Sequence, residues 1–95
     1  MLTIEEARIL AIEKLTEIQS QTTIKLVLLE NKTIEFKYGW VFFFHSEEFV
    51  KTGNIDFMIA GNGPIVIDKY NGTVDRFGTA RETSFYIQKY CESRE

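Results

Sequence analysis

The chain has 95 residues, of which 44% are hydrophobic and 26% charged, with a net charge of −3 and a pI near 5.2. A chain of this length can bury one core, so we expect a single domain spanning residues 1–95. The acidic balance gives no electrostatic reason to expect a nucleic acid or a membrane surface as partner, and it favours a basic protein partner instead.

Signals for export, membrane insertion and metal binding are missing from the sequence. Glu5 and Glu6 lie where the apolar core of a signal peptide would begin, and no apolar run approaches the ~20 residues of a membrane span. Cys91 is the only cysteine and His45 the only histidine, which excludes an internal disulfide and a site built on several histidines. We therefore expect a cytoplasmic protein that uses no cofactor and no metal.

The first predicted element is an amphipathic helix. Thr3 and Glu6 have the spacing of a capping box, in which each side chain accepts the backbone N–H of the other residue. Apolar residues then recur three or four positions apart, at Ile4, Ala7, Leu10, Ala11, Leu15 and Ile18. The pattern weakens in the polar run after Gln19, where we expect the helix to end.

Two strands are predicted next. Residues 24–29 form a short apolar run interrupted by Lys25, whose length and β-branched residues, Ile24 and Val27, favour a strand, and residues 33–38 alternate between apolar and polar. Residues 30–32 lie between them as a turn, so the two strands can form a hairpin. The second strand can also lie at a sheet edge and pair with another copy, which leaves both a monomer and a homodimer open.

Residues 40–44 form a continuous run of large apolar side chains, which predicts a strand covered on both faces or near the centre of the sheet. Gly39 offers a bulge or bend just before it. We place Trp40 in the core, with its indole N–H bonded to a backbone carbonyl. Ser46 and Gly53 then mark the two ends of a short helix, as an N-cap and a left-handed C-cap. Residues 54–60 give no clear pattern.

The last third of the chain predicts a hairpin and a closing helix. Residues 65–67 form a buried strand, and Asn71-Gly72 signals a tight turn into a further strand over residues 74–77. Asp68 and Asp75 flank this hairpin, which is sufficient to explain them. The apolar positions Phe85, Ile87, Tyr90 and Cys91 place a helix over residues 83–93.

Gly61-Asn62-Gly63 could be imagined as a phosphate cradle, but such a loop opens a helix N-terminus. Here Pro64 and a β-branched run follow instead. A structural turn in which the glycines adopt positive φ is the better interpretation. Together these elements predict an α+β fold, with an N-terminal helix packed on a mainly antiparallel sheet of four or five strands, a short middle helix and a C-terminal helix.

Four motifs, taken in order, resemble the signature of the immunity protein 35 family. They are Gly-Trp-Val-Phe-Phe-Phe at residues 39–44, Gly-Asn-Gly-Pro-Ile-Val-Ile-Asp at residues 61–68, Asn71-Gly72, and Gly-Thr-Ala at residues 78–80. The signature positions, which we expect to serve the fold, are Gly39, Trp40, Gly61, Gly63, Pro64, Asp68, Gly72, Gly78 and Thr79. The resemblance covers about two-thirds of the chain, with the motifs in the right order, and residues 22–38 match it less clearly.

The resemblance implies a bacterial cytosolic protein without catalytic residues, which neutralises a toxin of a polymorphic toxin system by binding it. We expect the loop over residues 46–63 to contact that partner, through Glu47, Glu48, Asp56 and Asn62. An alternative function is a chaperone-like or ligand-binding domain with an aromatic pocket near Trp40. An enzyme is the weakest interpretation, because no nucleophile and base, metal cluster or cofactor loop stands out.

Overall fold

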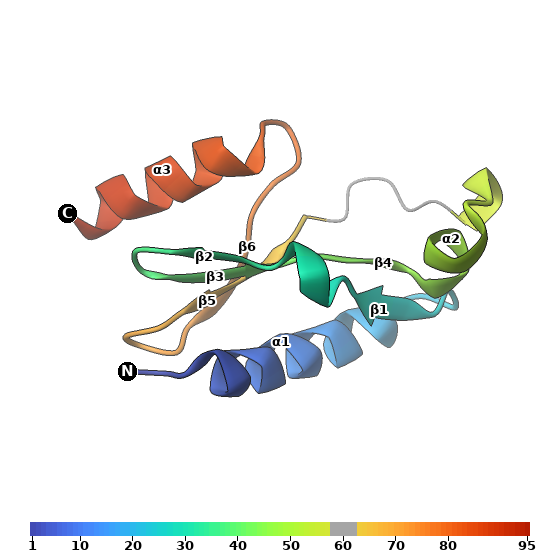
Figure 1. Ribbon diagram of the computed structural model, residues 1–95, viewed down its shortest axis with the longest axis horizontal. Coiled ribbons are helices and arrows are strands. Elements are labelled where there is room, and N and C mark those ends of the chain that lie inside the picture. The colour runs from blue at the N-terminus through green and yellow to red at the C-terminus, as the bar shows by residue number, and fades with distance from the viewer. Residues whose placement is uncertain (58–62) are drawn as a thin grey trace.

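A computed structural model of the chain, which describes residues 1–57 and 63–95, has three layers (Figure 1). Helix α1 (Ile4–Gln19) covers one face of a sheet and helix α3 (Thr83–Arg94) lies over the other. A short helix, α2 (Glu47–Thr52), projects from the far end of a molecule that measures 42 × 27 × 23 Å. The predicted α+β class with its three helices is confirmed, and α3 ends one residue later than expected.

Helix α1 begins with the predicted capping box. The Thr3 hydroxyl accepts the Glu6 N–H at 3.2 Å, and the Glu6 carboxylate accepts the Thr3 N–H at 3.0 Å. At the other end, the Gln19 side chain donates to the Ile24 carbonyl and accepts the Leu26 N–H, both at 2.7 Å. The small residues Ala7 and Ala11 on the buried stripe have no exposed surface, so the helix packs closely on the sheet.

The main sheet is antiparallel throughout, and its strand order is β2-β3-β5-β6. The strands are β2 (Ile34–Phe36), β3 (Gly39–Phe42), β5 (Ile65–Asp68) and β6 (Val74–Arg76). The core lies between this sheet and α1, where the inward residues of the central strands are buried: Trp40, Phe42, Ile65 and Ile67. The side chain of Trp40 is only 4% exposed, so the open aromatic pocket that the alternative function requires is not present at this residue.

A second, two-stranded sheet corrects the predicted pairing of the first half of the chain. Strand β1 (Leu26–Leu28) pairs with β4 (Phe44–Ser46), and β2 pairs with β3. The predicted hairpin between residues 24–29 and 33–38 is therefore wrong. The predicted strand over residues 40–44 is interrupted at Phe43, and the segments on either side of Phe43 join different sheets. The Leu29 N–H donates to the Phe43 carbonyl at 2.8 Å, so backbone pairing continues through the break.

The turns also differ from the prediction. Gly39 lies in regular register opposite Phe36 and Asp68, without a bulge. Between β5 and β6, the Asp68 N–H bonds the Thr73 carbonyl at 3.0 Å, so four residues form the connection. Gly72 has φ +70°, and no non-glycine residue in the described ranges has positive φ. The Asn71-Gly72 signal thus marks a longer turn with one left-handed residue instead of a two-residue type I′ turn, in which both central residues would need positive φ.

Trp40 departs from expectation in one further respect. Its indole N–H is buried and has no hydrogen-bond acceptor within the described parts of the chain, so the predicted bond to a carbonyl is wrong. The Lys69 ammonium lies 5.0 Å from the centre of the indole ring and also pairs with Glu35 at 2.9 Å. A cation over the ring face supplies a cation–π contact to a side chain whose N–H is unsatisfied.

Across residues 1–57 and 63–95, no helix is both long and apolar enough to cross a membrane.

Candidate partner-binding surface

Helix α2 and the 3-10 turn at Ile55–Phe57 form a projecting lobe, called here the α2 lobe (residues 46–57). The buried Ser46 hydroxyl accepts the Phe49 N–H at 3.2 Å, and Gly53 ends the helix with φ +70°. Both predicted caps are confirmed. Because Ser46 is also the last residue of β4, the start of the lobe is fixed to the sheet.

Glu47 is held by contacts within the protein. Its carboxylate pairs with Lys51 at 3.0 Å and with Lys25 at 3.3 Å, and its N–H donates to the Lys25 carbonyl at 2.9 Å. The hydrogen bond from Lys51, followed by that from Lys25, lowers the pKa of Glu47 below its usual value. This carboxylate therefore joins Lys25, the residue before β1, to α2, and its charge is compensated within the protein.

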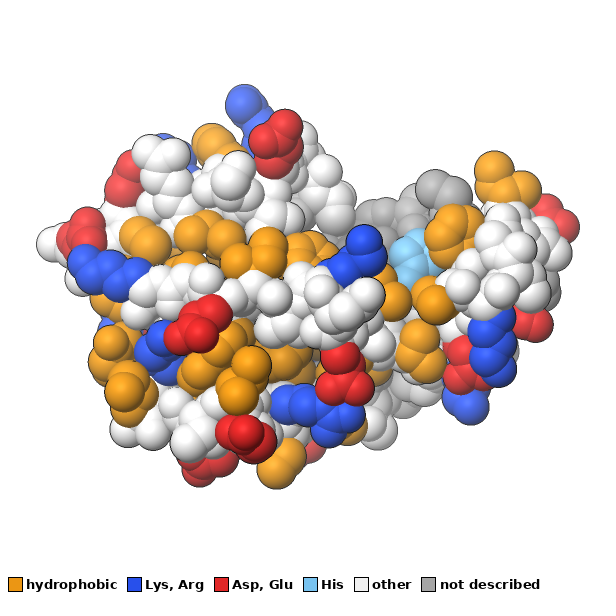
Figure 2. Space-filling view, viewed as in Figure 1, with side chains coloured by type: hydrophobic (Ala, Val, Ile, Leu, Met, Phe, Trp, Pro, Cys, Tyr) orange, Lys and Arg blue, Asp and Glu red, His pale blue; other side chains and the backbone are white. Residues whose placement is uncertain are grey.

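Glu48 and Asp56 differ from Glu47 because both are exposed and neither forms an ion pair within the described residues. The same lobe exposes two aliphatic side chains, Val50 at 51% and Ile55 at 75% exposure. On the face drawn in Figure 2, hydrophobic, acidic and basic side chains all reach the surface of this lobe, at the right-hand end of the molecule. The lobe thus combines apolar area with two carboxylates that form no ion pair within the described residues.

A surface groove of about 400 Å³ lies where the lobe meets the segment that connects α1 to β1. Its lining is Thr23, Ile24, Lys25, Ser46, Glu47 and Glu48. The structure thus brings Glu47 and Glu48 into one groove, and it places Asp56 on the adjoining 3-10 turn. Asn62 and Gly61, the remaining predicted positions of the loop, lie outside the described residues.

His45 has a structural role. Its Nδ1 accepts the Ser46 N–H at 2.8 Å, and its ring lies 4.5 Å from that of Phe49. The side chain therefore packs against α2 and supports the base of the lobe. No group of three histidine, cysteine or acidic side chains in the described ranges is placed to hold a metal ion.

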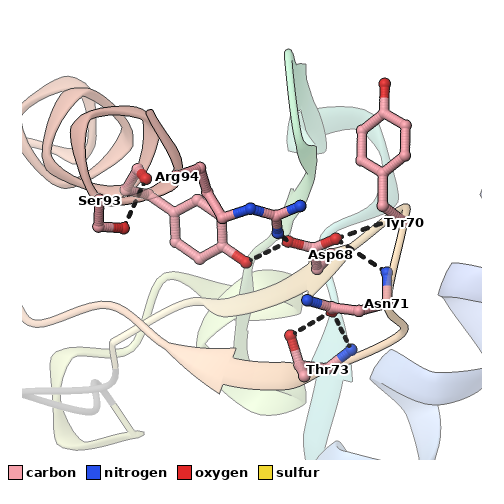
Figure 3. Close-up of polar contacts among 7 residues, drawn as sticks. Asp68, Tyr70, Asn71, Thr73, Ser93 and Arg94 are labelled. Atoms are coloured by element: carbon pink, nitrogen blue, oxygen red, sulfur yellow. Dashed lines mark hydrogen bonds and ion pairs between the residues drawn. The ribbon is translucent and has the colours of Figure 1, made fainter.

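Asp68 forms a second polar cluster at the opposite end of the sheet (Figure 3). The carboxylate has no exposed surface; Oδ1 accepts the N–H groups of Tyr70 and Asn71, at 2.8 and 3.1 Å. Oδ2 accepts the Tyr90 hydroxyl at 2.5 Å and pairs with Arg94. Asp68 is thus more than a hairpin residue, because it ties α3 to the β5–β6 turn.

The environment of Asp68 keeps it ionised. Burial by itself raises the pKa of this carboxyl, but the hydrogen bonds from Tyr90 and the turn backbone, together with the Arg94 charge, outweigh burial and hold the pKa below its usual value. A carboxylate with four donors has no free lone pair for acid–base chemistry. Tyr90 and Arg94 lie 22 and 26 positions after Asp68 in the sequence, so no local pattern predicts these contacts.

Several other signature positions lie at close contacts between segments of the chain. A Cβ added to Gly39 would lie 1.9 Å from the Ile67 carbonyl oxygen, and one added to Gly63 would lie 1.9 Å from that of Phe77. Gly63 is therefore required for close approach, and the positive φ predicted for it is wrong. The buried Pro64 accepts the Phe77 N–H at 3.0 Å. Gly78 lies against the Tyr86 hydroxyl, whereas nothing in the structure explains Thr79.

Comparison with known proteins shows the family of the chain. The family model for immunity protein 35 matches residues 5–92. The chain is also 42% identical over 55 residues to the uncharacterised protein YrhB of Escherichia coli strain K12. That alignment covers 58% of this chain and 58% of YrhB. No solved structure matches. The family match extends over nearly the whole fold described above, and the chain belongs to the immunity protein 35 family.

Proposed function

We propose that this protein is a bacterial immunity protein, which neutralises a toxin by binding it directly and stoichiometrically. Membership of the immunity protein 35 family supports a protein partner of this kind. The net charge of −3 supports a partner with a basic surface. The structural observation that carries the proposal is the α2 lobe, where the exposed carboxylates of Glu48 and Asp56 flank exposed aliphatic side chains.

The two kinds of side chain on the lobe have different parts in the proposed complex. Val50 and Ile55 lose exposed apolar area on contact, which supplies affinity. Glu48 and Asp56 attract a basic surface, which raises the association rate and disfavours wrong partners. Glu47 acts indirectly, since its bonds to Lys25 and Lys51 orient the helix that carries Glu48. Asn62 remains a proposed contact of the loop that follows.

Neutralisation by this route requires no chemistry from the protein itself. A bound immunity protein blocks a toxin by occupying its surface, and we propose that it does so in the cytoplasm of the cell that makes the toxin. The gene for the toxin is expected beside that of this protein, as part of a polymorphic toxin system. The adjacent gene thus supplies the probe for a test.

The test is co-expression with the C-terminal domain of the protein encoded by the adjacent gene, with growth as the readout. Wild-type protein is expected to restore growth, and Glu48→Lys to restore it less well. Glu5→Lys is the matched control, because Glu5 is also exposed and lies on α1 away from the lobe. The two substitutions change the net charge by the same amount. If Glu48→Lys and Glu5→Lys protect equally well, Glu48 is not part of the binding surface. Absence of protection by the wild-type protein would contradict the function itself.

A further inference from the structure

Strand β6 is an outer strand of the main sheet, and one of its two edges is open. The Thr73 carbonyl accepts the Asp68 N–H, and the Phe77 N–H donates to the Pro64 carbonyl, both at 3.0 Å. The backbone groups of alternate residues, Thr73, Asp75 and Phe77, therefore point toward β5. The N–H and C=O groups of Val74 and Arg76 therefore face away from the sheet. No hydrogen bond reaches these four groups within the residues that the structure describes.

Two surface grooves run beside this edge, one on each face of the sheet. The groove on the α1 side has a volume of about 210 Å³ and is lined by Leu10, Glu13, Lys14, Glu17 and Val74. The groove on the α3 side has a volume of about 300 Å³ and is lined by Asp75, Arg76, Phe77, Tyr86, Lys89 and Tyr90. Successive side chains of a strand point to opposite faces, so a strand added at β6 would place its side chains alternately in these grooves.

The opposite edge of the sheet is less receptive. In β2, the backbone N–H and C=O groups of Ile34 and Phe36 point toward β3. Only those of Glu35 point outward from this strand. Its carboxylate pairs with Lys69 at 2.9 Å, and next to it Lys37 pairs with Glu95 at 2.8 Å. Charged and ion-paired side chains are a common means of protecting a sheet edge from pairing. The β6 edge combines more free backbone groups with a groove on either side.

Charge indicates what kind of strand this edge accepts. Glu13 lines the α1-side groove and Asp75 the α3-side groove, and neither forms an ion pair in the described part of the chain. The groove lysines Lys14 and Lys89 are paired with Glu17 and Glu92, so a lysine or arginine in the added strand would compensate Glu13 and Asp75. A second copy of this chain is a poor occupant, because the register that pairs the whole of β6 with itself places Asp75 opposite Asp75, and like charges directly opposite each other are unfavourable.

We propose that the β6 edge binds an extended segment of another protein by strand addition, and that this segment carries lysine or arginine beside apolar residues. Its backbone pairs with Val74 and Arg76, and its side chains fill the two grooves. The proposal concerns a surface separate from the α2 lobe, and it does not depend on the identity of the proposed toxin.

The test uses a displayed library of random 12-residue peptides, selected for binding to the wild-type protein. Three variants then distinguish the effect of losing a backbone N–H from the effect of losing a side chain. Arg76→Pro removes the outward N–H and Arg76→Ala keeps it, while both lose the contact of the Arg76 side chain with the Gly63 carbonyl. Glu35→Pro makes the equivalent change at the β2 edge. Circular dichroism shows whether each variant is folded.

The expected result is a set of basic and apolar peptides that bind Arg76→Pro about tenfold more weakly than Arg76→Ala, and Glu35→Pro as tightly as wild type. In the unmodified protein, bound peptide should slow hydrogen exchange at the Val74 and Arg76 amides, a readout that does not depend on the variants. The proposal is wrong if no peptide is enriched, if Arg76→Pro and Arg76→Ala bind equally, or if those amides stay unprotected. A concentration-dependent dimer that is lost in Arg76→Pro would assign the edge to a second copy instead and would also overturn it.

Discussion

The hydroxyl of Tyr90 donates a 2.5 Å hydrogen bond to Oδ2 of Asp68, a carboxylate without exposed surface. The bond matters because no residue of α3 is fully buried. Arg94 at the end of α3 pairs with the same carboxylate, and ring contacts add to these bonds, such as those of Tyr90 with Phe36 and of Tyr86 with Phe77, each 5.6 Å between centroids. A small number of polar contacts therefore decides whether α3 stays in place.

We predict that Tyr90→Phe lowers the free energy of unfolding by about 2 kcal/mol, the usual contribution of a hydrogen bond to a charged group. Hydrogen exchange should accelerate first along α3, because the helix loses its attachment to the β5–β6 turn while the core beneath α1 is unchanged. Urea unfolding and amide exchange measure the two effects. Tyr70→Phe is the control, since Tyr70 is 57% exposed. Equal effects of the two variants would show that the Tyr90 hydroxyl has no special role.

Asp68 also predicts how stability depends on pH. Its folded-state pKa is below the usual value, so the folded protein holds this proton less tightly than the unfolded chain does. The stabilising effect is therefore complete above the unfolded pKa of about 4 and is lost as pH falls through the lower folded pKa. Urea unfolding of wild type and Asp68→Asn between neutral and strongly acidic pH should show two curves that converge in acid. A constant separation at every pH would contradict this assignment.

Gly39→Ala is predicted to be much more damaging than Gly53→Ala. A Cβ at Gly39 would meet backbone of β5 at 1.9 Å, so β3 and β5 would have to separate in the centre of the sheet, at a cost of about 3 kcal/mol or more. A Cβ at Gly53 meets nothing within 4 Å, and the cost is only that of a left-handed backbone, about 1–2 kcal/mol. Thermal unfolding of both variants measures the difference. Similar losses would mean that the sheet adjusts to the extra atom.

Glu47→Gln is predicted to lower the unfolding midpoint, whereas Glu48→Gln leaves it unchanged. Of these two carboxylates, only that of Glu47 forms ion pairs within the described residues, to Lys25 and Lys51, and its pKa is lowered by those contacts. Added salt should reduce the difference, since exposed ion pairs are screened. Thermal melts of both variants at low and high salt check this. A lower midpoint for Glu48→Gln would mean that its carboxylate has a partner within the chain and is not free for binding.

Local signals in the sequence were sufficient for the helices. The capping box at Thr3 and Glu6, and the caps at Ser46 and Gly53, each lie within one turn of the helix that they end, so α1 and α2 could be located from residue order alone. Strand pairing could not be located in this way. The break at Phe43 lies inside a uniform aromatic run, and the partner of β1 lies 16 or more residues further along the chain.

The candidate surface shows the same division. Glu48 and Asp56 could be identified as exposed carboxylates from the sequence, and the structure leaves both without an ion pair in its described ranges. The bond between Glu47 and Lys25 joins residues 22 positions apart, and the exposure of Ile55 depends on the turn that presents it, so neither could be predicted. The ion pair of Asp68 with Arg94 could not be predicted either, because the two residues are far apart in the sequence.

The most direct test of the central claim is a titration of purified toxin domain, from the protein encoded by the adjacent gene, with this protein, with toxin activity as the readout. Stoichiometric neutralisation predicts that activity falls in proportion to added protein and reaches zero at one equivalent, with a complex of the two on a sizing column. A toxin that stays fully active in excess protein, with no complex formed, would contradict the proposed function.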